Sequence, residues 1–308
     1  MRGRQLLAGG AVAVSLAFLG PAVSTARPAT SGPCGTAPVS STKYTHVLWI
    51  WMENHSYSQI IGSRYAPYIN GLAGKCGLAT TYHNITHPSL PNYIAATSGL
   101  SALKQFKTDC EPSATCSTNA PSIFGQVSSW KAYEESMPTN CDKTSAQKYA
   151  VKHNPPPYYS TLKGCSSYDV PYTQLAGDLA GGTLPAFSFV TPNMTDDMHN
   201  GTIAQGDQWL AANVPSILAS SAYTSNSLVV VITWDEGAGG STNQCATNTT
   251  DVGCHVATLV ISPSTSPGTR SGNLFNHWSL LGTTETLLKV PMLANAASAG
   301  SMIPDFNL

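Results

Sequence analysis

Two long apolar runs, each followed by acidic or amide residues, constrain the fold of this chain most strongly. The first run, VLWIWM, precedes Glu53 and Asn54, and the second, LVVVITW, precedes Asp235 and Glu236. Both runs consist of β-branched, aromatic and other apolar residues with little polar alternation, which is typical of strands buried on both faces of a sheet. The sequence therefore predicts a buried sheet with carboxyl groups at one edge.

Shorter segments alternate between strand and helix patterns along the chain. Strands are expected at 42–53, 77–84, 183–192, 227–236 and 255–263, and helices at 65–76, 90–99, 202–220 and 279–290. This alternation predicts an α/β fold with a mostly parallel central sheet flanked by helices on both faces. Residues 101–182 are rich in turns and cysteines, and we expect them to form a loop-rich insertion stapled by disulfides.

The first 26 residues have the pattern of an export signal. MRGR is basic, LLAGGAVAVSLAFL is apolar, and Ser24 and Ala26 form a small-x-small site that predicts cleavage after Ala26. Residues 27–42 are rich in Pro, Ser and Thr and are expected to be a flexible lead-in, and 43–308 a single domain. No later apolar stretch has the length of a membrane helix. We therefore expect a secreted protein without stable membrane insertion.

The chain contains eight cysteines, which in an exported protein indicate disulfides. No C-x-x-C pair is present, which argues against a zinc–thiolate site. Sequence alone permits many pairings. The spacing of the cysteines along the chain suggests the pairs Cys110–Cys116, Cys141–Cys165 and Cys245–Cys254. This leaves Cys34–Cys76 to anchor the mature N-terminus.

Charged residues make up 10% of the chain, and the formal net charge is −1 at pH 7. A typical soluble domain has about 25% charged residues. Such a sparse and nearly neutral composition provides no basic surface for nucleic acid or for an anionic membrane. The few acids that follow strands are correspondingly informative.

Ligands of open α/β sheets bind at the carboxyl ends of the strands. A third apolar run, TLPAFSFV, leads into a loop that contains Asp197 and His199. Oxygen ligands with one or two histidines suit a divalent metal ion, with zinc, calcium and manganese as the candidates. The expected ligands are Glu53, Asn54, Asp235 and Glu236.

The stretch THPSLPNYIAATSG places Ser89 just before the expected helix at 90–99. Its oxygen would lie near the free N–H groups and the positive end of the helix dipole, where phosphate groups bind. A metal can deprotonate a nearby hydroxyl, so the combination indicates phosphoryl transfer with Ser89 as nucleophile. The alternative is that Ser89 is only a helix cap, worth about 1 kcal/mol.

Six motifs in this order resemble those of a known family: WMENHSYSQIIG, THPSLPNYIAATSG, KHNPPPYY, TPNMTDDMHNG, TWDEG and NHWSLLGTTETLL. Together they resemble the phosphoesterase family of secreted acid phosphatases and phospholipase C-like enzymes, within the alkaline-phosphatase-like superfamily. The likeness extends from about Val47 to Leu288. It implies an alkaline-phosphatase-like fold and a metal-dependent hydrolase of small phosphate esters.

The resemblance implies that the oxygen of Ser89 completes the set of metal ligands. It also implies roles for residues outside that set. Asp197 and His199 match a segment at the active site, and His153 matches a Lys-His-Asn-Pro segment, so His199 and His153 join Ser89 as expected catalytic residues. The candidates for binding phosphate or a second metal are Asp197, His277 and Asn92. Ordinary alternatives stay open: a surface loop for His153, a buried histidine bonded to backbone for His277, and a loop brace for Asn92.

Three features favour an acid-phosphatase-like phosphomonoesterase with a phosphoserine intermediate over a phospholipase C-type phosphodiesterase. The chain lacks the TDPPH-like motif and the extended C-terminal region of the larger phospholipase C members, and its charge is sparse. Glutamate stands where two-zinc members have an Asp-His pair, which leaves open a single metal. A non-catalytic secreted binding protein on the same scaffold is the alternative from another class. No G-x-S-x-G motif surrounds Ser89, which argues against a serine esterase.

Overall fold

The computed structural model describes residues 1, 3, 32–239, 244–248 and 250–308. Apart from Met1 and Gly3, the expected export signal and its cleavage site lie outside the described residues. Among the helices described, none combines the length and the apolar character that crossing a membrane requires.

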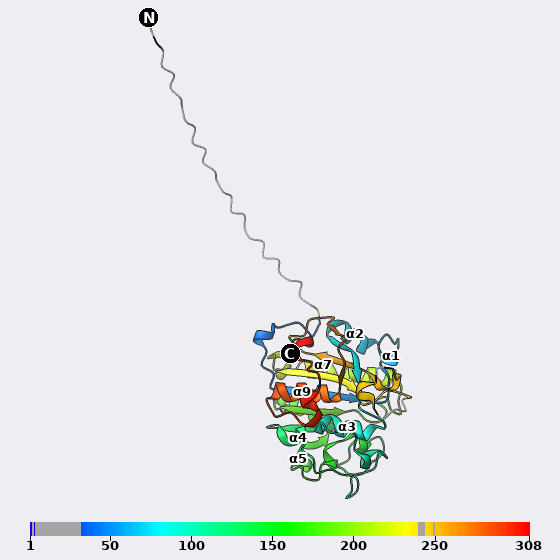
Figure 1. Cartoon of the computed structure of the whole chain (residues 1–308). Helices are drawn as coiled ribbons and strands as arrows, with labels where there is room; N and C mark the ends of the chain where they lie inside the picture. The colour runs from blue at the N-terminus through cyan, green and yellow to red at the C-terminus, as the bar shows by residue number, and fades with distance from the viewer. Residues whose placement is uncertain (2, 4–31, 240–243, 249) are drawn as a thin grey trace.

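A nine-stranded sheet forms the centre of the described part of the chain (Figure 1). The strand order is β4-β3-β5-β1-β6-β7-β2-β8, and β9 also pairs with β2. The strands are β1 His46–Met52, β2 Gly77–His83, β3 Trp130–Glu134, β4 Asp169–Pro171, β5 Phe187–Thr191, β6 Leu228–Trp234, β7 His255–Ile261, β8 Arg270–Ser271 and β9 Phe275–Asn276. Strand β7 is antiparallel to both neighbours and the other pairings are parallel, so the predicted mostly parallel sheet is confirmed.

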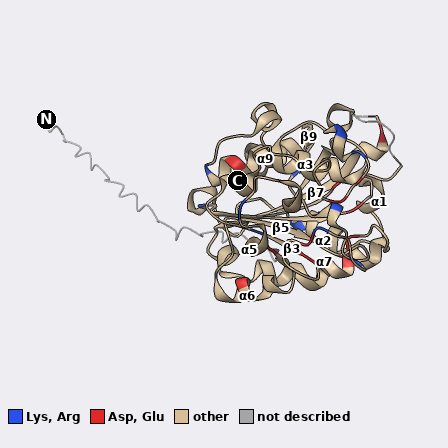
Figure 2. Ribbon diagram, turned by 90° about the horizontal axis from the view of Figure 1, so that it is seen from below, with Lys and Arg blue, Asp and Glu red and all other residues tan. Residues whose placement is uncertain are grey.

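Helices cover both faces of the sheet, as predicted. Helices α3 and α9 lie on one face and α2 and α7 on the other (Figure 2). The α-helices are α1 Tyr57–Ile60, α2 Pro67–Lys75, α3 Ser89–Ser98, α4 Ile123–Gln126, α5 Cys165–Tyr168, α6 Gln174–Gly181, α7 Ile203–Leu218, α8 Ser221–Thr224, α9 His277–Leu288 and α10 Ile303–Phe306. Short 3-10 segments are η1 Val39–Ser41, η2 Lys104–Phe106, η3 Val151–His153, η4 Pro156–Tyr158, η5 Cys245–Thr247, η6 Val252–Cys254 and η7 Ala294–Ser298.

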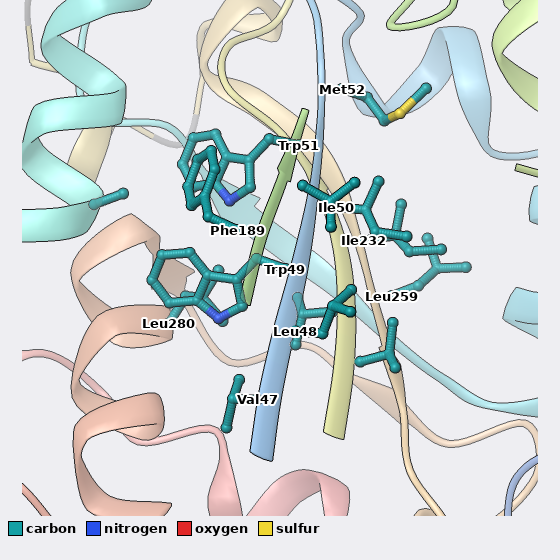
Figure 3. Close-up of a cluster of buried hydrophobic side chains, with 14 of the residues drawn as sticks. Val47, Leu48, Trp49, Ile50, Trp51, Met52, Phe189, Ile232, Leu259 and Leu280 are labelled. Atoms are coloured by element: carbon teal, nitrogen blue, oxygen red, sulfur yellow. The ribbon is translucent and has the colours of Figure 1, made fainter. Parts of the chain in front are cut away.

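The central strand β1 is buried on both faces, which explains its continuous apolar sequence. Trp49 and Trp51 point to the face covered by α9, where they pack near Phe189, and Leu48 and Ile50 point to the opposite face (Figure 3). Trp49 also donates a hydrogen bond from Nε1 to the hydroxyl of Thr284 in α9, at 3.1 Å. Two apolar layers therefore hold β1 in a fixed position, and with it the residues that follow it.

Residues 101–182 are loop-rich, as expected, but they also contribute β3 and β4 to the sheet. The sequence analysis did not predict these two strands. The first, Trp130–Glu134, contains charged residues, and the second, Asp169–Pro171, has only three residues. Neither has the long apolar run by which the inner strands were found. The region is therefore part of the central sheet and reaches the same edge as β1.

All four expected disulfides are present: Cys34–Cys76, Cys110–Cys116, Cys141–Cys165 and Cys245–Cys254. Of the expected lead-in, residues 32–42 are described. Within it Cys34 is fully buried, and the backbone N–H of Ala37 donates to the carbonyl of Pro263 at 3.0 Å. The disulfide thus ties this segment to the end of α2.

The C-terminus of α3 provides a test of the fold. Gly99 has a φ of 71°, and a Cβ there would lie 2.1 Å from the carbonyl oxygen of Leu293, whereas Gly62, with a φ of 84°, has open space around it. Both substitutions to alanine incur about 1–2 kcal/mol for a left-handed conformation. We expect Gly99→Ala to lower the free energy of unfolding by a further ~1–3 kcal/mol because of the close contact. Urea unfolding of both variants measures the difference, and equal effects would contradict this packing.

Candidate active site

The carboxyl ends of β1, β5 and β6 meet at one edge of the sheet because these strands are parallel neighbours. The backbone N–H of Glu53 donates to the carbonyl of Asp197 at 2.8 Å. The backbone N–H of Asn54 donates to Asp235 Oδ1 at 3.2 Å. Three loops that are distant in sequence therefore converge, as the strand-end pattern predicted.

The acidic side chains at this edge are removed from solvent. Glu53, Asp197 and Asp235 are fully buried, and Glu236 is nearly so. Burial raises the pKa of Glu53 well above its usual value, and the neighbouring carboxyls of Asp235 and Asp197 raise it further. Burial and the adjacent Glu236 likewise raise the pKa of Asp235. Ionised together, these groups require a compensating positive charge.

Ser89 lies within this cluster. It is the first residue of α3, it is buried, and its Oγ donates a hydrogen bond to Glu53 Oε2 at 3.2 Å. The N-cap position of the helix is taken by Pro88. Ser89 is therefore directed at the acidic cluster from the first turn of the helix, which is more than a capping role requires.

His153 and Tyr93 enclose Glu53 on the side away from Ser89. His153 Nε2 lies 3.1 Å from Glu53 Oε1, and His153 Nδ1 lies 3.3 Å from Asp197 Oδ2. The hydroxyl of Tyr93 donates to Glu53 Oε1, and its ring stacks on His153 with centroids 5.4 Å apart. Sequence analysis missed Tyr93, although it stands four residues after Ser89, one helical turn away.

His199 is the more accessible of the two expected catalytic histidines, since it is only partly buried. Its backbone N–H donates to Asp197 Oδ1 at 2.7 Å, and its Nδ1 hydrogen-bonds Asn200 Oδ1 at 2.8 Å. The rings of His199 and His153 lie 5.6 Å apart. One ligand atom of each of Glu53, His153 and His199 lies within 4.8 Å of the others, so these residues are also grouped closely enough to share an ion.

Glu236 has partners that the sequence analysis did not assign. His87 Nδ1 lies 2.8 Å from Glu236 Oε2, and Asn92 Nδ2 donates to the same oxygen at 3.4 Å. Asn92 Oδ1 accepts hydrogen bonds from the backbone N–H groups of Ile85 and Thr86. Asn92 thus braces the loop before α3, which is the ordinary alternative for this residue. His87 could have been suspected because it stands two residues before Ser89.

His277 lies behind the site instead of facing it. Its Nε2 lies 2.7 Å from the carbonyl oxygen of Asp235, and its Nδ1 lies 3.1 Å from the hydroxyl of Tyr82. Burial lowers its pKa to about 4. Both ring nitrogens are engaged, so the structure gives the buried, backbone-bonded alternative and leaves neither nitrogen to bind phosphate or a second metal.

A divalent cation fits among these residues. Asp235 Oδ2 is buried without a hydrogen-bond partner in the part of the chain that the structure describes. The side-chain amide of Asn54 lies 2.6 Å from Glu53 Oε2 and 3.2 Å from Asp235 Oδ1. If the Asn54 amide nitrogen faces the two carboxylates, the amide donates a hydrogen bond to each of them. If the amide oxygen faces them, three oxygens from Asn54, Glu53 and Asp235 converge, and a bound cation stabilises that arrangement. Glu53, Asn54, Asp235 and Ser89 thus offer a set of oxygen ligands.

Comparison with known proteins indicates a family for the chain that carries these residues at the edge of its sheet. A family model described as the phosphoesterase family matches residues 63–291. The chain belongs to this family. The predicted class, a hydrolase of phosphoric esters, is thereby confirmed at the level of the family.

Two curated relatives and one solved structure illustrate the likeness. A phosphatidylinositol-3-phosphatase of Mycobacterium tuberculosis is 34% identical over 267 residues, which cover 86% of this chain and 84% of that protein. An acid phosphatase of Aspergillus fumigatus is 26% identical over 83% of this chain and 58% of that protein. The crystal structure of an alkaline phosphatase superfamily protein from Vibrio parahaemolyticus has a TM-score of 0.56 at 13% identity, covering 91% and 76% of the two chains. The predicted alkaline-phosphatase-like fold is confirmed.

The raised pKa values of the buried acids predict how a metal affects stability. Because the folded pKa values of Glu53, Asp197 and Asp235 lie above their unfolded values of about 4, these groups contribute most to the stability of the metal-free fold below that pH, and this contribution is lost as pH rises through the folded values. A bound cation offsets this loss. We expect zinc, calcium or manganese to raise the Tm of chelator-treated protein more at pH 8 than at pH 4.5.

Differential scanning fluorimetry across this pH range measures the effect. Asp235→Asn is expected to reduce it, whereas Asp178→Asn, which alters an ion pair with Lys131 elsewhere, is expected to retain it. A Tm that no ion raises at any pH would contradict the proposed fit.

Proposed function

We propose that this protein is a secreted, metal-dependent phosphomonoesterase of the acid-phosphatase type that acts through a phosphoserine at Ser89. The observation that carries the proposal is the hydroxyl of Ser89, buried at the start of α3 and hydrogen-bonded to Glu53 within a cluster of buried carboxyls, in a chain of the phosphoesterase family. The four disulfides and the expected export signal support secretion.

The site supplies the parts that phosphoryl transfer requires. A divalent cation held by Glu53, Asn54 and Asp235 would supply Lewis-acid chemistry, polarising phosphate oxygens and lowering the pKa of a neighbouring hydroxyl. Ser89 Oγ attacks phosphorus while its proton passes to Glu53 Oε2, its hydrogen-bond partner. The Oγ–P bond forms, the ester P–O bond breaks, and the leaving alcohol takes a proton. Water then attacks phosphorus and gives a proton to the histidine that protonated the alcohol. The Oγ–P bond breaks, phosphate leaves, and Ser89 Oγ recovers its proton from Glu53.

His153 and His199 have different roles in the proposed mechanism. His153 is enclosed between Glu53 and Asp197, and burial lowers its pKa well below the usual value. As a neutral imidazole it carries a single N–H, so we assign it the positioning of one of these two carboxyls. His199 is partly exposed, so it is the histidine that an incoming ester can reach. We assign to His199 the protonation of the leaving alcohol.

The substrate class follows from the family and from the relatives. The two relatives described above are both named as phosphatases and neither as a phospholipase C. This favours a small phosphomonoester as substrate over the phosphodiester of a phospholipase C-type enzyme. A non-catalytic binding protein is disfavoured because the nucleophile, the acids and both histidines stand together at one edge of the sheet.

Removal of the nucleophile tests the mechanism. We expect Ser89→Ala to lower kcat on 4-nitrophenyl phosphate by at least about 10³-fold and to abolish covalent labelling by a ³²P-phosphomonoester in an acid quench. Ser98→Ala is the matched control, because Ser98 is buried in the same helix and donates to the backbone of Ile94. Retained turnover in the Ser89 variant would overturn the role of this residue.

A substrate panel tests the class and the metal requirement. We expect the wild-type protein to hydrolyse 4-nitrophenyl phosphate at least about tenfold faster than bis(4-nitrophenyl) phosphate, to lose this activity with a chelator, and to regain it with one of the three candidate ions. Preference for the diester would replace the proposal with the phospholipase C-type alternative. No hydrolysis of either ester under any metal would support the binding protein.

A further inference from the structure

A lysine–aspartate ion pair lies beside the first turn of α3. Asp109 Oδ1 accepts a hydrogen bond from the backbone N–H of Leu90 at 3.0 Å, and Asp109 Oδ2 lies 3.0 Å from Lys152 Nζ. Leu90 directly follows Ser89, and Lys152 directly precedes His153. The pair therefore joins the segment that carries the nucleophile to the segment that carries the buried histidine.

The loop that carries Asp109 is held in place by its own contacts. The disulfide Cys110–Cys116 closes the loop immediately after Asp109. The hydroxyl of Tyr158 donates to the carbonyl oxygen of Cys110 at 2.7 Å. The carboxylate of Asp109 thus has a defined position, and it fixes the position of the Lys152 ammonium in turn.

The ion pair is more accessible than the groups behind it. The side chains of Lys152 and Asp109 are 21% and 20% exposed, whereas those of His153 and Glu53 are 2% and 0% exposed. The Lys152 ammonium can therefore be contacted from solvent, whereas the Glu53 carboxyl cannot. Lys152 is available to a ligand without any rearrangement of the core.

The charge of Lys152 acts on the acidic cluster. Burial raises the pKa values of Glu53, Asp197 and Glu236, and the Lys152 ammonium lowers each of them in part. Asp109 holds the ammonium beside the first turn of α3, since the same carboxylate accepts a hydrogen bond from the backbone N–H of Leu90. A phosphate that reaches Ser89 is repelled by these carboxyls, and a fixed positive charge beside them offsets that repulsion.

We propose that Lys152 binds the substrate phosphate, that Asp109 positions it, and that this lysine selects the dianionic phosphate of a monoester over the monoanionic phosphate of a diester. The inference rests on the proposed function and adds a residue that distinguishes substrates by charge. A monoester phosphate loses its second proton with a pKa of about 6 and then carries two charges. A diester has no second acidic proton, so it gains less from a compact ammonium.

Three variants of the metal-loaded protein test this role: Lys152→Met, Lys152→Arg and Asp109→Asn. We expect Lys152→Met to raise the KM for 4-nitrophenyl phosphate and the inhibition constant of inorganic phosphate by about 10- to 100-fold, the loss expected for one charged hydrogen bond. Its kcat/KM for bis(4-nitrophenyl) phosphate should change by less than about threefold. Lys152→Arg is expected to restore most of the phosphate affinity, and Asp109→Asn to weaken it less than Lys152→Met does.

Lys131→Met is the matched control, because Lys131 is 22% exposed and is paired with Asp178 at 2.6 Å elsewhere in the fold. It should leave every constant unchanged. An equal loss on both esters, or unchanged phosphate inhibition in Lys152→Met, would overturn the proposal. Calorimetric titration with inorganic phosphate gives a readout that needs no turnover. If the wild type hydrolyses neither ester, the proposed function fails, while the role of Lys152 is still decided by this titration.

Discussion

The burial of three neighbouring carboxyl groups, those of Glu53, Asp197 and Asp235, is the main physical demand that this structure has to satisfy. Each is removed from water and close to the others, so each favours its protonated form. An apolar core alone cannot hold such a group of charges. Hydrogen-bond donors from Ser89, Tyr93 and the backbone of Asn54 offset part of this cost, and a divalent cation bound to the same oxygens would offset more. In the function proposed above, the same carboxyl groups would hold the cation and accept the proton of Ser89.

The neighbouring elements meet this demand from several directions. Tyr93 and Ser89 donate to Glu53 from α3, and the loop after β5 brings Asp197 against His153. His277, the first residue of α9, hydrogen-bonds the backbone carbonyl oxygen of Asp235 through its Nε2. Helices on one face of the sheet therefore support residues at its edge, and the rigid β1 that carries Glu53 is held between two apolar layers. Stability of the core and precision of the site depend on the same packing.

Much of the fold and of the candidate site could be predicted from the sequence, because a strand that is buried on both faces consists of a continuous apolar run. The runs before Glu53 and Asp235 predicted two central strands, and parallel pairing then required their ends to meet. The short strands β3 and β4 have no such apolar run, and only β4 lies at the edge of the sheet. Tyr93 was not predicted because its contact with Glu53 depends on how α3 is rotated about its axis relative to β1. The residue pattern of α3 alone does not give this rotation.

The sequence by itself determined the class of fold and the groups that gather at the strand ends, since these depend on local composition and on the direction of parallel strands. It suggested the disulfide pairs by spacing, and the structure established them. Only the tertiary structure decided what each group does there. It turned His277 toward a backbone carbonyl, used Asn92 as a brace, and brought Lys152 and Asp109 to the first turn of α3. These outcomes depend on the path of loops through space, because a side chain can act only on the atoms that packing places within its reach.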